Sequence, residues 1–562
     1  MDNKKLADRL FPKVHMTPEE LEAKFPPRKL PEGAKVTRFA PSPTGFVHFG
    51  GMYQVMIGER LAHLSGGIFY LRIEDTDSKR EVSDAARRLI QTLRDYGINF
   101  DEGADIGEDG TICDKGEYGP YRQSLRANIY HVYAKKLVSE GKAYPVFTSD
   151  EELEAVLAAD KKEENKTKDW ESEAEKQRLE TLKNRNFTLD TVEKELAAGH
   201  KFVLRILADG DPNKKTIFDD LVKGRLEIPE NDEDFVLLKS DGIPTYHFAH
   251  AVDDHLMRTT HVIRGEEWLP SIAKHIMLFR YLGFRMPKYI HTAQIMRLDE
   301  NGNRKKLSKR DLGANMDDYD EKGYPRESVT EYLMTLINSN FEEWRAQNPS
   351  KLYTEFPFSI KKMSVSGCLF DYDKLMDVSK NTIARMSARQ VYDRLLSWTK
   401  KYDTEFYILL NDNEQYAIDI LSIGRGGKKP RKDFGTWSEV RNNISFFYDT
   451  LFTPDYEYLK NADKQTVLSV LSEYPTLYDE RDDQNEWFTK LKSLASKLGY
   501  APEMKEYKEN PENFKGSVAD IAMILRVAVT GRQQSPDTFE VIRIMGREKL
   551  TKRVALAQKS LF

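Results

Sequence analysis

The chain has 562 residues, a net charge of −5 and a composition that is 40% hydrophobic and 31% charged. This length exceeds one hydrophobic core and predicts three to five domains, and the composition excludes global disorder. The two cysteines, Cys113 and Cys368, exclude a disulfide framework and are interpreted as packed thiols. The sequence contains neither a long apolar run nor a signal-peptide core, so we expect a cytoplasmic protein without a membrane partner.

The first domain follows an N-terminal extension, residues 1–35, in which TPEELEAKF predicts a helix. AKVTRFA then predicts a strand, MYQVMIGERLAHLSGG a helix that ends at two glycines, and IFYLRI a second strand. A strand, a glycine-bearing turn, a helix and a strand in this order predict a βαβ unit in a parallel sheet.

The turn between the first strand and the helix, residues 37–51, reads TRFAPSPTGFVHFGG. A glycine-rich turn before a helix suits phosphate binding, because backbone amides and the helix N-terminus can face an anion. The segment is not a P-loop, since Gly51 and Met52 stand where that motif needs Lys and Ser or Thr. The dinucleotide pattern G-x-G-x-x-G is absent as well.

At the mouth of this helix stand His48, Gly50 and Gly51. The imidazole can donate to a phosphate oxygen, and glycines let a planar base approach the backbone. Taken alone, a histidine beside glycines is more often an ordinary turn residue.

The pattern changes over residues 141–240, where a charge-dense segment, residues 161–185, predicts a solvated helix or hairpin. FVLRIL and FVLLKS predict strands, and so does TYHFAHAVDD, in which Asp253 and Asp254 would point different ways. SIAKHIMLFRYLGF predicts a helix. From about residue 385 the patterns are mainly helical.

A second short motif, Lys306-Leu307-Ser308-Lys309-Arg310, places three cations on one loop. Mobile cations suit the charge that develops on transferring and leaving phosphates. The motif alone is equally typical of a solvated basic patch. It becomes informative when it is paired with the first motif.

Together the two motifs resemble the HIGH and KMSKS signatures of class I aminoacyl-tRNA synthetases. PSPTG and RIEDTD are similar to the glutamyl-tRNA synthetase family in particular, and the match continues through YRQSLR, FDDLVKG, THVIRGEEWL and LRVAVTGRQQSPDTFEV. It spans roughly residues 36 to 560. The mainly helical C-terminal third resembles the anticodon-binding region of the bacterial type.

The resemblance implies an α/β multidomain fold with a Rossmann-like parallel-sheet catalytic domain, an inserted acceptor-binding domain and a mainly α-helical anticodon-binding region. The implied parts are the extension (1–35), the first catalytic half (36–140), the insertion (141–240), the second catalytic half (241–305), the KLSKR loop with a stem-contact domain (306–385) and the helical region (386–562).

The resemblance also implies the reaction. ATP, with Mg²⁺ on its phosphates, activates L-glutamate to glutamyl-adenylate, and the glutamyl group passes to the 3′-terminal adenosine of tRNA-Glu; tRNA-Gln stays open as a second acceptor. His48, Lys306 and Lys309 would be catalytic. The implied ATP-binding residues are His48, Gly50, Gly51, Glu267, Trp268, Lys306, Leu307, Ser308 and Lys309.

For glutamate, the resemblance assigns Arg38 to the side-chain carboxylate and Glu74 to the α-ammonium group. A contact of His250 with substrate and a packed core histidine stay open as alternatives. Asp253 and Asp254 are interpreted as structural or as positioning the tRNA end. The implied glutamate-binding residues are Arg38, Ala40, Ser42, Glu74, Tyr246, His250 and Arg264.

Three alternatives differ in the sequence. Glutaminyl enzymes typically read PEPNG and place a neutral residue where Arg264 stands, a noncatalytic paralogue should have lost motif residues, and a shorter relative that modifies a tRNA base lacks the helical region. Some bacterial relatives carry a Cys-x-Cys zinc site after Ala143-Tyr144, where this chain reads AYPVFTSDEEL, so we expect no zinc and no other resident metal.

Two further expectations concern partners. The segment 424–434, GRGGKKPRKDF, would lie along a tRNA backbone or form a mobile solvated loop. The chain is expected to be a monomer.

Overall fold

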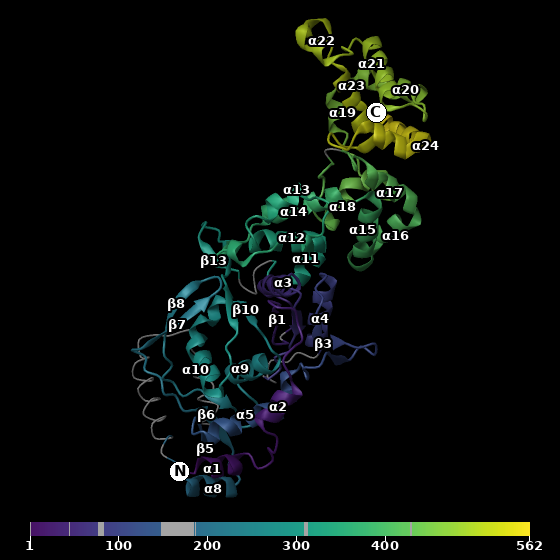
Figure 1. The fold of residues 1–562 in the computed structure, drawn as a ribbon. Coiled ribbons are helices and arrows are strands. Elements are labelled where there is room, and N and C mark those ends of the chain that lie inside the picture. Colours follow the sequence, from purple (N-terminus) through teal and green to yellow (C-terminus); the bar gives the residue numbers. More distant parts are fainter. Residues whose placement is uncertain are drawn as a thin grey trace. The chain divides into compact units, whose positions relative to one another are not determined.

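The computed structural model describes residues 2–43, 45–76, 84–147, 185, 187–307, 313–427 and 430–561 (Figure 1). The chain divides into two compact units. One comprises Met1–Asp318 and Leu333–Asp371, and the other comprises Tyr319–Tyr332 and Tyr372–Phe562. Most of the charged segment 161–185 lies outside the described residues, and the finer domain boundaries stay predictions.

The first unit begins its core with the predicted βαβ unit. Strand β1 (Val36–Phe39), helix α3 (Phe49–His63) and strand β2 (Ile68–Leu71) follow in order, and the two strands pair in parallel. Strand β3 (Glu102–Ile106) follows helix α4 (Ala85–Asp95) and pairs in parallel with β2. Strand β4 (Ile112–Lys115) pairs antiparallel with β3 at the edge of the sheet. Buried Val55, Ile57 and Leu61 on α3 explain why that helix packs on the sheet.

A second sheet adjoins the first through β10 (His261–Gly265), which pairs in parallel with β11 (Lys288–Thr292). The amide of Thr260 donates to the carbonyl of Val36 over 2.9 Å, which places β10 beside β1. The parallel strands therefore run in the order β3, β2, β1, β10, β11, as in a doubly wound fold. This confirms the predicted Rossmann-like sheet.

The span predicted as an insertion contributes to two sheets. Strands β5 (Ala143–Phe147), β6 (Phe202–Ile206) and β9 (Val236–Leu238) form an antiparallel sheet of their own. The hairpin of β7 (Lys215–Asp220) and β8 (Gly224–Pro229) instead extends the catalytic sheet, with β7 beside β11.

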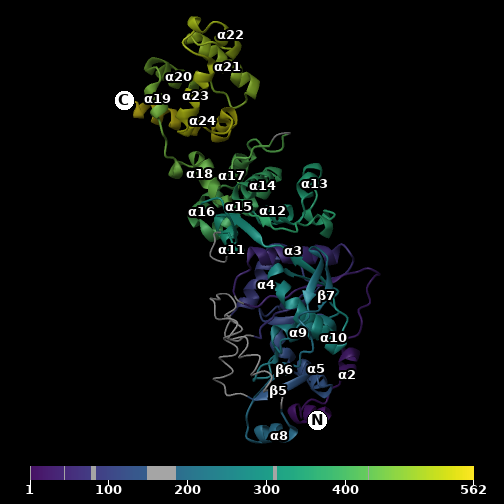
Figure 2. The ribbon, with the colours of Figure 1, turned by 90° about the vertical axis from the view of Figure 1, so that its left-hand side faces the viewer.

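The N-terminal extension forms helices α1 (Asn3–Leu10) and α2 (Pro18–Lys24). The predicted α2 begins at a capping box in which Thr17 and Glu20 bond to each other's backbone amides. Figures 1 and 2 show α1 beside α8 (Leu189–Ala197) and near β5 and β6. Arg9 on α1 pairs with Glu193 on α8 at 2.9 Å.

The strand predicted over TYHFAHAVDD is wrong, because this segment is helix α9 (Tyr246–Leu256). Every residue from Phe248 to Asp254 is buried. A helix that is buried all round shows no apolar stripe of period 3.6, so its sequence does not reveal it. The helix α10 (Ile272–Leu282) was predicted and is present, ending at Gly283 in the left-handed conformation.

The second unit is mainly helical, as predicted, and one continuous apolar cluster holds it together. No helix among the described residues has the length and apolarity needed to cross a membrane. The helices of the second unit include α14 (Tyr372–Arg385), α15 (Ala388–Tyr402), α16 (Thr404–Asp412), α17 (Glu414–Ser422), α18 (Trp437–Ile444), α19 (Glu457–Asn461), α20 (Lys464–Leu477), α21 (Gln484–Lys497), α22 (Met504–Glu509), α23 (Val518–Thr530) and α24 (Thr538–Ser560).

His63, in the last turn of α3, gives the first unit a pH-dependent contact. Its Nε2 lies 3.0 Å from Asp101, and its Nδ1 lies 3.5 Å from Glu59. These carboxylates raise the pKa of His63 to about 9. Because the pKa is higher in the folded protein, the stabilisation is complete below about pH 6.5 and is lost as pH rises through 9.

We therefore expect His63→Gln to lower the free energy of unfolding by about 1–2 kcal/mol at pH 6, after discounting for partial exposure, and by much less at pH 10. Melting temperatures of both proteins at the two pH values measure this. His15→Gln, at an exposed histidine, is the control. An equal loss of stability at both pH values would contradict the assignment.

Candidate active site

The first motif surrounds the start of α3. His48 is the N-cap residue, and its Nδ1 accepts a hydrogen bond of 3.0 Å from the amide of Gly50. A Cβ at Gly50 would lie 3.2 Å from this nitrogen, which is tighter than ordinary contact. Glycine therefore lets the imidazole fold over the helix N-terminus, where an anion is favoured.

The structure brings the flank of the second motif to this turn. The amide of Phe49 donates to the carbonyl of Ala314 over 2.8 Å, and the amide of Met316 donates to Val47 over 3.0 Å. Before the loop, Lys306 is exposed at the end of β13 (Arg304–Lys306) and Leu307 is buried. Ser308, Lys309 and Arg310 lie outside the described residues.

A buried ion-pair network lies between β1, β2 and α9. Asp254 on α9 pairs with Arg38 at 3.2 Å and with Arg72 at 2.6 Å. Arg72 reaches Glu74 at 3.1 Å. Burial raises the pKa of Glu74, and the two arginines oppose that effect. The predicted carboxylate and ammonium contacts, Arg38 and Glu74, thus lie in one network.

Asp253 shares Arg72 with its neighbour, at 3.8 Å, and has three further partners of its own. It accepts from Arg126 over 2.6 Å, from Gln123 over 2.9 Å and from Tyr130 over 2.8 Å. These residues come from the YRQSLR motif and α5 (Ala127–Ser139). Asp253 and Asp254 are both fully buried and paired, which supports the structural interpretation over a role at the tRNA end.

Arg264, at the end of β10, has only neutral partners among the contacts described. Its Nε donates to His291 over 3.0 Å, and its terminal nitrogens lie 3.3 Å from the Tyr246 hydroxyl and 3.2 Å from His275. The side chain is 4% exposed. The charge of a buried guanidinium whose described partners are neutral is not compensated by them, so it can attract an incoming anion.

His250 packs inside the core. Its Nε2 lies 2.8 Å from the Tyr289 hydroxyl and its Nδ1 lies 2.9 Å from Asp254. Burial lowers the pKa of His250 to about 4, so the ring is neutral. These contacts favour the packed core histidine of the two alternatives, and a contact with substrate stays a prediction.

The remaining predicted residues border the same region. The rings of Tyr246 and Trp268 approach to 4.3 Å between centroids. Glu267 is exposed, and Ser42 is exposed in the turn after β1. The amide of Glu74 donates to the carbonyl of Pro41 over 2.9 Å. This hydrogen bond holds the segment that contains the partly buried Ala40 next to Glu74.

Sequence reasoning missed several residues that hold this site. Arg72, Arg126 and Asp220 stand in motifs that the sequence analysis quoted, but no chemistry was assigned to them. His275 and His291 stand in no motif, so only their place in the fold identifies them. Cys113 is exposed on β4, at the edge of its sheet, so its description as a packed thiol is wrong, whereas Cys368 is buried.

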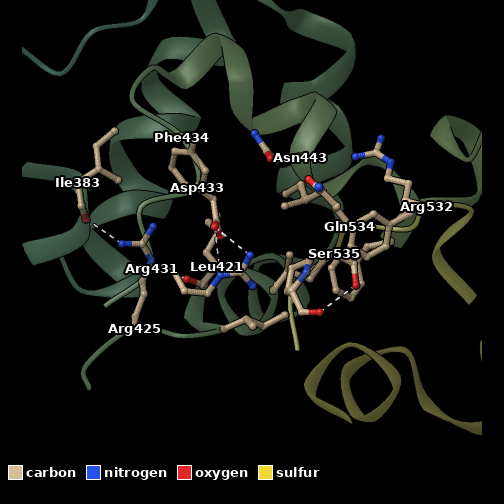
Figure 3. Close-up of a pocket in the computed structure, with 16 residues that line it drawn as sticks. Ile383, Leu421, Arg425, Arg431, Asp433, Phe434, Asn443, Arg532, Gln534 and Ser535 are labelled. Carbon is tan, nitrogen blue, oxygen red and sulfur yellow. Dashed lines mark hydrogen bonds and ion pairs between the residues drawn. The ribbon is translucent and has the colours of Figure 1, made fainter. Parts of the chain in front are cut away.

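The second unit holds a pocket of about 340 Å³ (Figure 3). Arg425 and Arg431, from the segment predicted as a tRNA contact or solvated loop, line it together with Arg532. Arg425 donates to the carbonyl of Ile383 over 2.7 Å, and Arg431 pairs with Asp433 at 2.8 Å. Lys428 and Lys429 lie outside the described residues, so neither alternative for this segment is decided.

The doubly wound sheet, the histidine-capped helix and the buried ion-pair network are typical of an enzyme with a Rossmann-like catalytic unit. Two family models agree with this class. Residues 35–375 match the catalytic domain of class I tRNA synthetases (E and Q), and residues 430–558 match an anticodon binding domain.

Similar proteins extend over the whole chain. A glutamate–tRNA ligase from Acetivibrio thermocellus is 47% identical, covering 99% of each chain, and one from Clostridium perfringens strain 13 is 45% identical, covering 99% of this chain and 100% of its own. A glutamate tRNA ligase structure from Elizabethkingia meningosepticum has a TM-score of 0.71 at 24% identity, covering 94% and 100%, which establishes the fold. The chain belongs to the class I tRNA synthetases of the E and Q type.

Proposed function

We propose that this enzyme attaches L-glutamate to transfer RNA. An oxygen of the α-carboxylate attacks the α-phosphorus of ATP and pyrophosphate leaves, forming glutamyl-adenylate. A hydroxyl of the terminal tRNA adenosine then attacks the acyl carbon and AMP leaves. The full-length relatives named glutamate–tRNA ligases support this reaction, and the match to the anticodon binding domain supports tRNA as the partner.

The observation that carries the choice of amino acid is the buried Arg264 with its neutral partners. Glutamate brings a side-chain carboxylate that compensates this charge, whereas glutamine brings a neutral amide that leaves it uncompensated. Arg38 already shares Asp254 with Arg72, so Arg264 is the stronger anion site of the two. Glu74 supplies a carboxylate for the α-ammonium group.

For ATP, we propose that His48, Gly50 and Gly51 border the nucleotide at the N-terminus of α3. Lys306 and Lys309 would stabilise the leaving pyrophosphate, with Leu307 and Ser308 between them. Glu267 and Trp268 complete this side. Mg²⁺ enters as the counter-ion of the ATP triphosphate.

A resident metal is not part of the proposal. The ranges that the structure describes contain no group of three His, Cys, Asp or Glu side chains suited to a metal ion. The absence of zinc stays a prediction.

The test is aminoacylation of purified tRNA-Glu and tRNA-Gln with labelled glutamate and labelled glutamine, in the presence of ATP and Mg²⁺. We expect glutamate on tRNA-Glu. Charging with glutamine alone would identify a glutaminyl enzyme, and no charging would identify a noncatalytic paralogue. Glutamate on tRNA-Gln would show a relaxed choice of tRNA.

We propose that the enzyme works as a monomer in the cytoplasm, where its substrates occur.

The arginine-lined pocket of the second unit is proposed to take a tRNA nucleotide. Arg532 donates to Ser445 over 2.9 Å and lies over the Phe446 ring at 5.6 Å, so its guanidinium is held in the pocket wall. We expect Arg532→Gln to raise the KM for tRNA about tenfold and to leave the KM for glutamate within twofold, because one charged contact to RNA is lost.

Aminoacylation at varied tRNA concentration measures this. Arg481→Gln is a matched control, since Arg481 is an exposed arginine whose ion pair among the described residues is with nearby Asp479. An unchanged KM for tRNA in the Arg532 variant would remove this pocket from tRNA binding.

A further inference from the structure

Arg264 is held by an imidazole whose hydrogen-bonding roles are fixed. Asp220 Oδ2 accepts from the His291 backbone amide over 3.1 Å and lies 2.7 Å from His291 Nδ1. A carboxylate only accepts, so Nδ1 carries the proton and Nε2 keeps its lone pair. That lone pair accepts the 3.0 Å hydrogen bond from Arg264 Nε.

Asp220 is itself locked in place. Its Oδ1 accepts from the amides of Val222 and Lys223 over 2.9 and 2.7 Å, in the turn between β7 and β8. Burial raises its pKa, but the hydrogen bonds from His291 and these amides outweigh it, so the pKa lies below its ordinary value. Asp220 is therefore ionised and holds both of its oxygens in fixed roles.

A second branch approaches Arg264 from the helices. A terminal nitrogen of Arg264 lies 3.2 Å from His275 Nδ1, and His275 Nε2 lies 3.1 Å from His247 Nδ1. Burial lowers the pKa of His275 well below its ordinary value, so this ring also stays neutral. If Arg264 donates to His275, then His275 donates to His247, and each proton in the branch has an acceptor.

This arrangement solves a physical problem. A carboxylate in direct contact with Arg264 would orient the guanidinium but also neutralise it, whereas His291 places a neutral ring between the two charges. The stacked ring of Tyr289, 5.7 Å from His291 and nearly parallel to it, keeps the imidazole in its plane. The guanidinium is thereby oriented and still lacks a direct anionic partner among its described contacts.

We propose that Asp220 and His291 are positioning residues that set the preference of this enzyme for a carboxylate over an amide side chain. They act through Arg264, which they orient without neutralising. The proposal rests on the proposed function, because it assumes that Arg264 meets the side chain of glutamate. Asp220 belongs to the β7–β8 hairpin, so a segment outside the two catalytic halves contributes to amino acid choice.

Two substitutions at His291 separate the two roles of its ring. In His291→Gln the amide oxygen can take the place of Nε2 and accept from Arg264, whereas in His291→Asn the shorter amide replaces Nδ1 and leaves Arg264 Nε without an acceptor. We expect the KM for glutamate to rise at least tenfold in His291→Asn and about threefold in His291→Gln. The KM for ATP should stay within twofold in both.

Asp220→Asn is the second arm. One amide cannot accept at both positions, so its NH₂ group must face either His291 or the backbone amides. If it faces His291 it donates to Nδ1, and the proton moves to Nε2, opposite Arg264 Nε–H. We expect a tenfold rise in the KM for glutamate and a smaller ratio of kcat/KM for glutamate over glutamine.

The assay is aminoacylation by the full chain, with melting temperatures as a check on folding. His261→Gln is the control, because His261 is a buried histidine on the same strand as Arg264 that contacts Thr260 instead. Equal effects of the two His291 variants, or KM values for glutamate and ATP that rise together, would overturn the proposal. If the unaltered protein does not charge tRNA with glutamate, the proposed function fails and the inference falls with it.

Discussion

Arg264→Gln is expected to lower kcat/KM for glutamate about a thousandfold, or ~4 kcal/mol, because two charge-assisted hydrogen bonds of about 1.5–3 kcal/mol each are lost. Glutamine should lose little, since its amide never compensated the guanidinium. The ratio of kcat/KM values for the two amino acids in aminoacylation measures the change.

Arg280→Gln is the control for this experiment. Arg280 forms an exposed ion pair with Asp209 on the same unit, and such pairs contribute about 0–1 kcal/mol. An Arg264 variant that keeps the preference for glutamate over glutamine would show that another residue reads the side chain. Arg38 would then be the next candidate.

Asp254→Asn is expected to destabilise the first unit by about 3–5 kcal/mol, because it leaves Arg38 and Arg72 buried with one carboxylate fewer. Burial raises the pKa of Asp254, yet the two arginines hold that pKa well below its ordinary value. The group is thus ionised in the folded protein and its removal is not silent at neutral pH.

Urea denaturation, followed by intrinsic fluorescence, measures the loss in the free energy of unfolding. Asp209→Asn, which removes the partner of Arg280 at the surface, is the matched control. We also expect Asp254→Asn to raise the KM for glutamate, since Arg38 and Arg72 lose the group that orients them. A change of less than 1 kcal/mol would show that the neighbouring Asp253 and Glu74 compensate the arginines.

The local elements followed from local patterns. The βαβ unit, the helix α10 and the helical second unit have clear periods or capping residues, and the structure confirms them. The helix from Tyr246 to Leu256 was not predicted, because a helix buried on all sides lacks the apolar stripe of helical period that identifies one. Helix α9 is identified only from the strands and helices that pack around it in the structure.

The candidate site shows the same division. Motif residues such as Arg38, Glu74 and Arg264 could be named from the sequence because they stand in recognisable strings. Their partners could not, since Asp254 reaches Arg38 across 216 positions of the chain and Asp220 reaches His291 across 71. No periodicity or spacing encodes contacts between such distant residues.

By itself the sequence determined the class of enzyme and the parallel-sheet core and named the candidate site residues, because these depend on short motifs and local conformation. Only the tertiary structure decided which charges are compensated. It pairs Arg38 with a buried carboxylate and gives Arg264 neutral imidazoles. Whether a buried cation is free to bind an anion depends on the groups that the fold packs around it, and those groups come from strands and helices far apart in the chain.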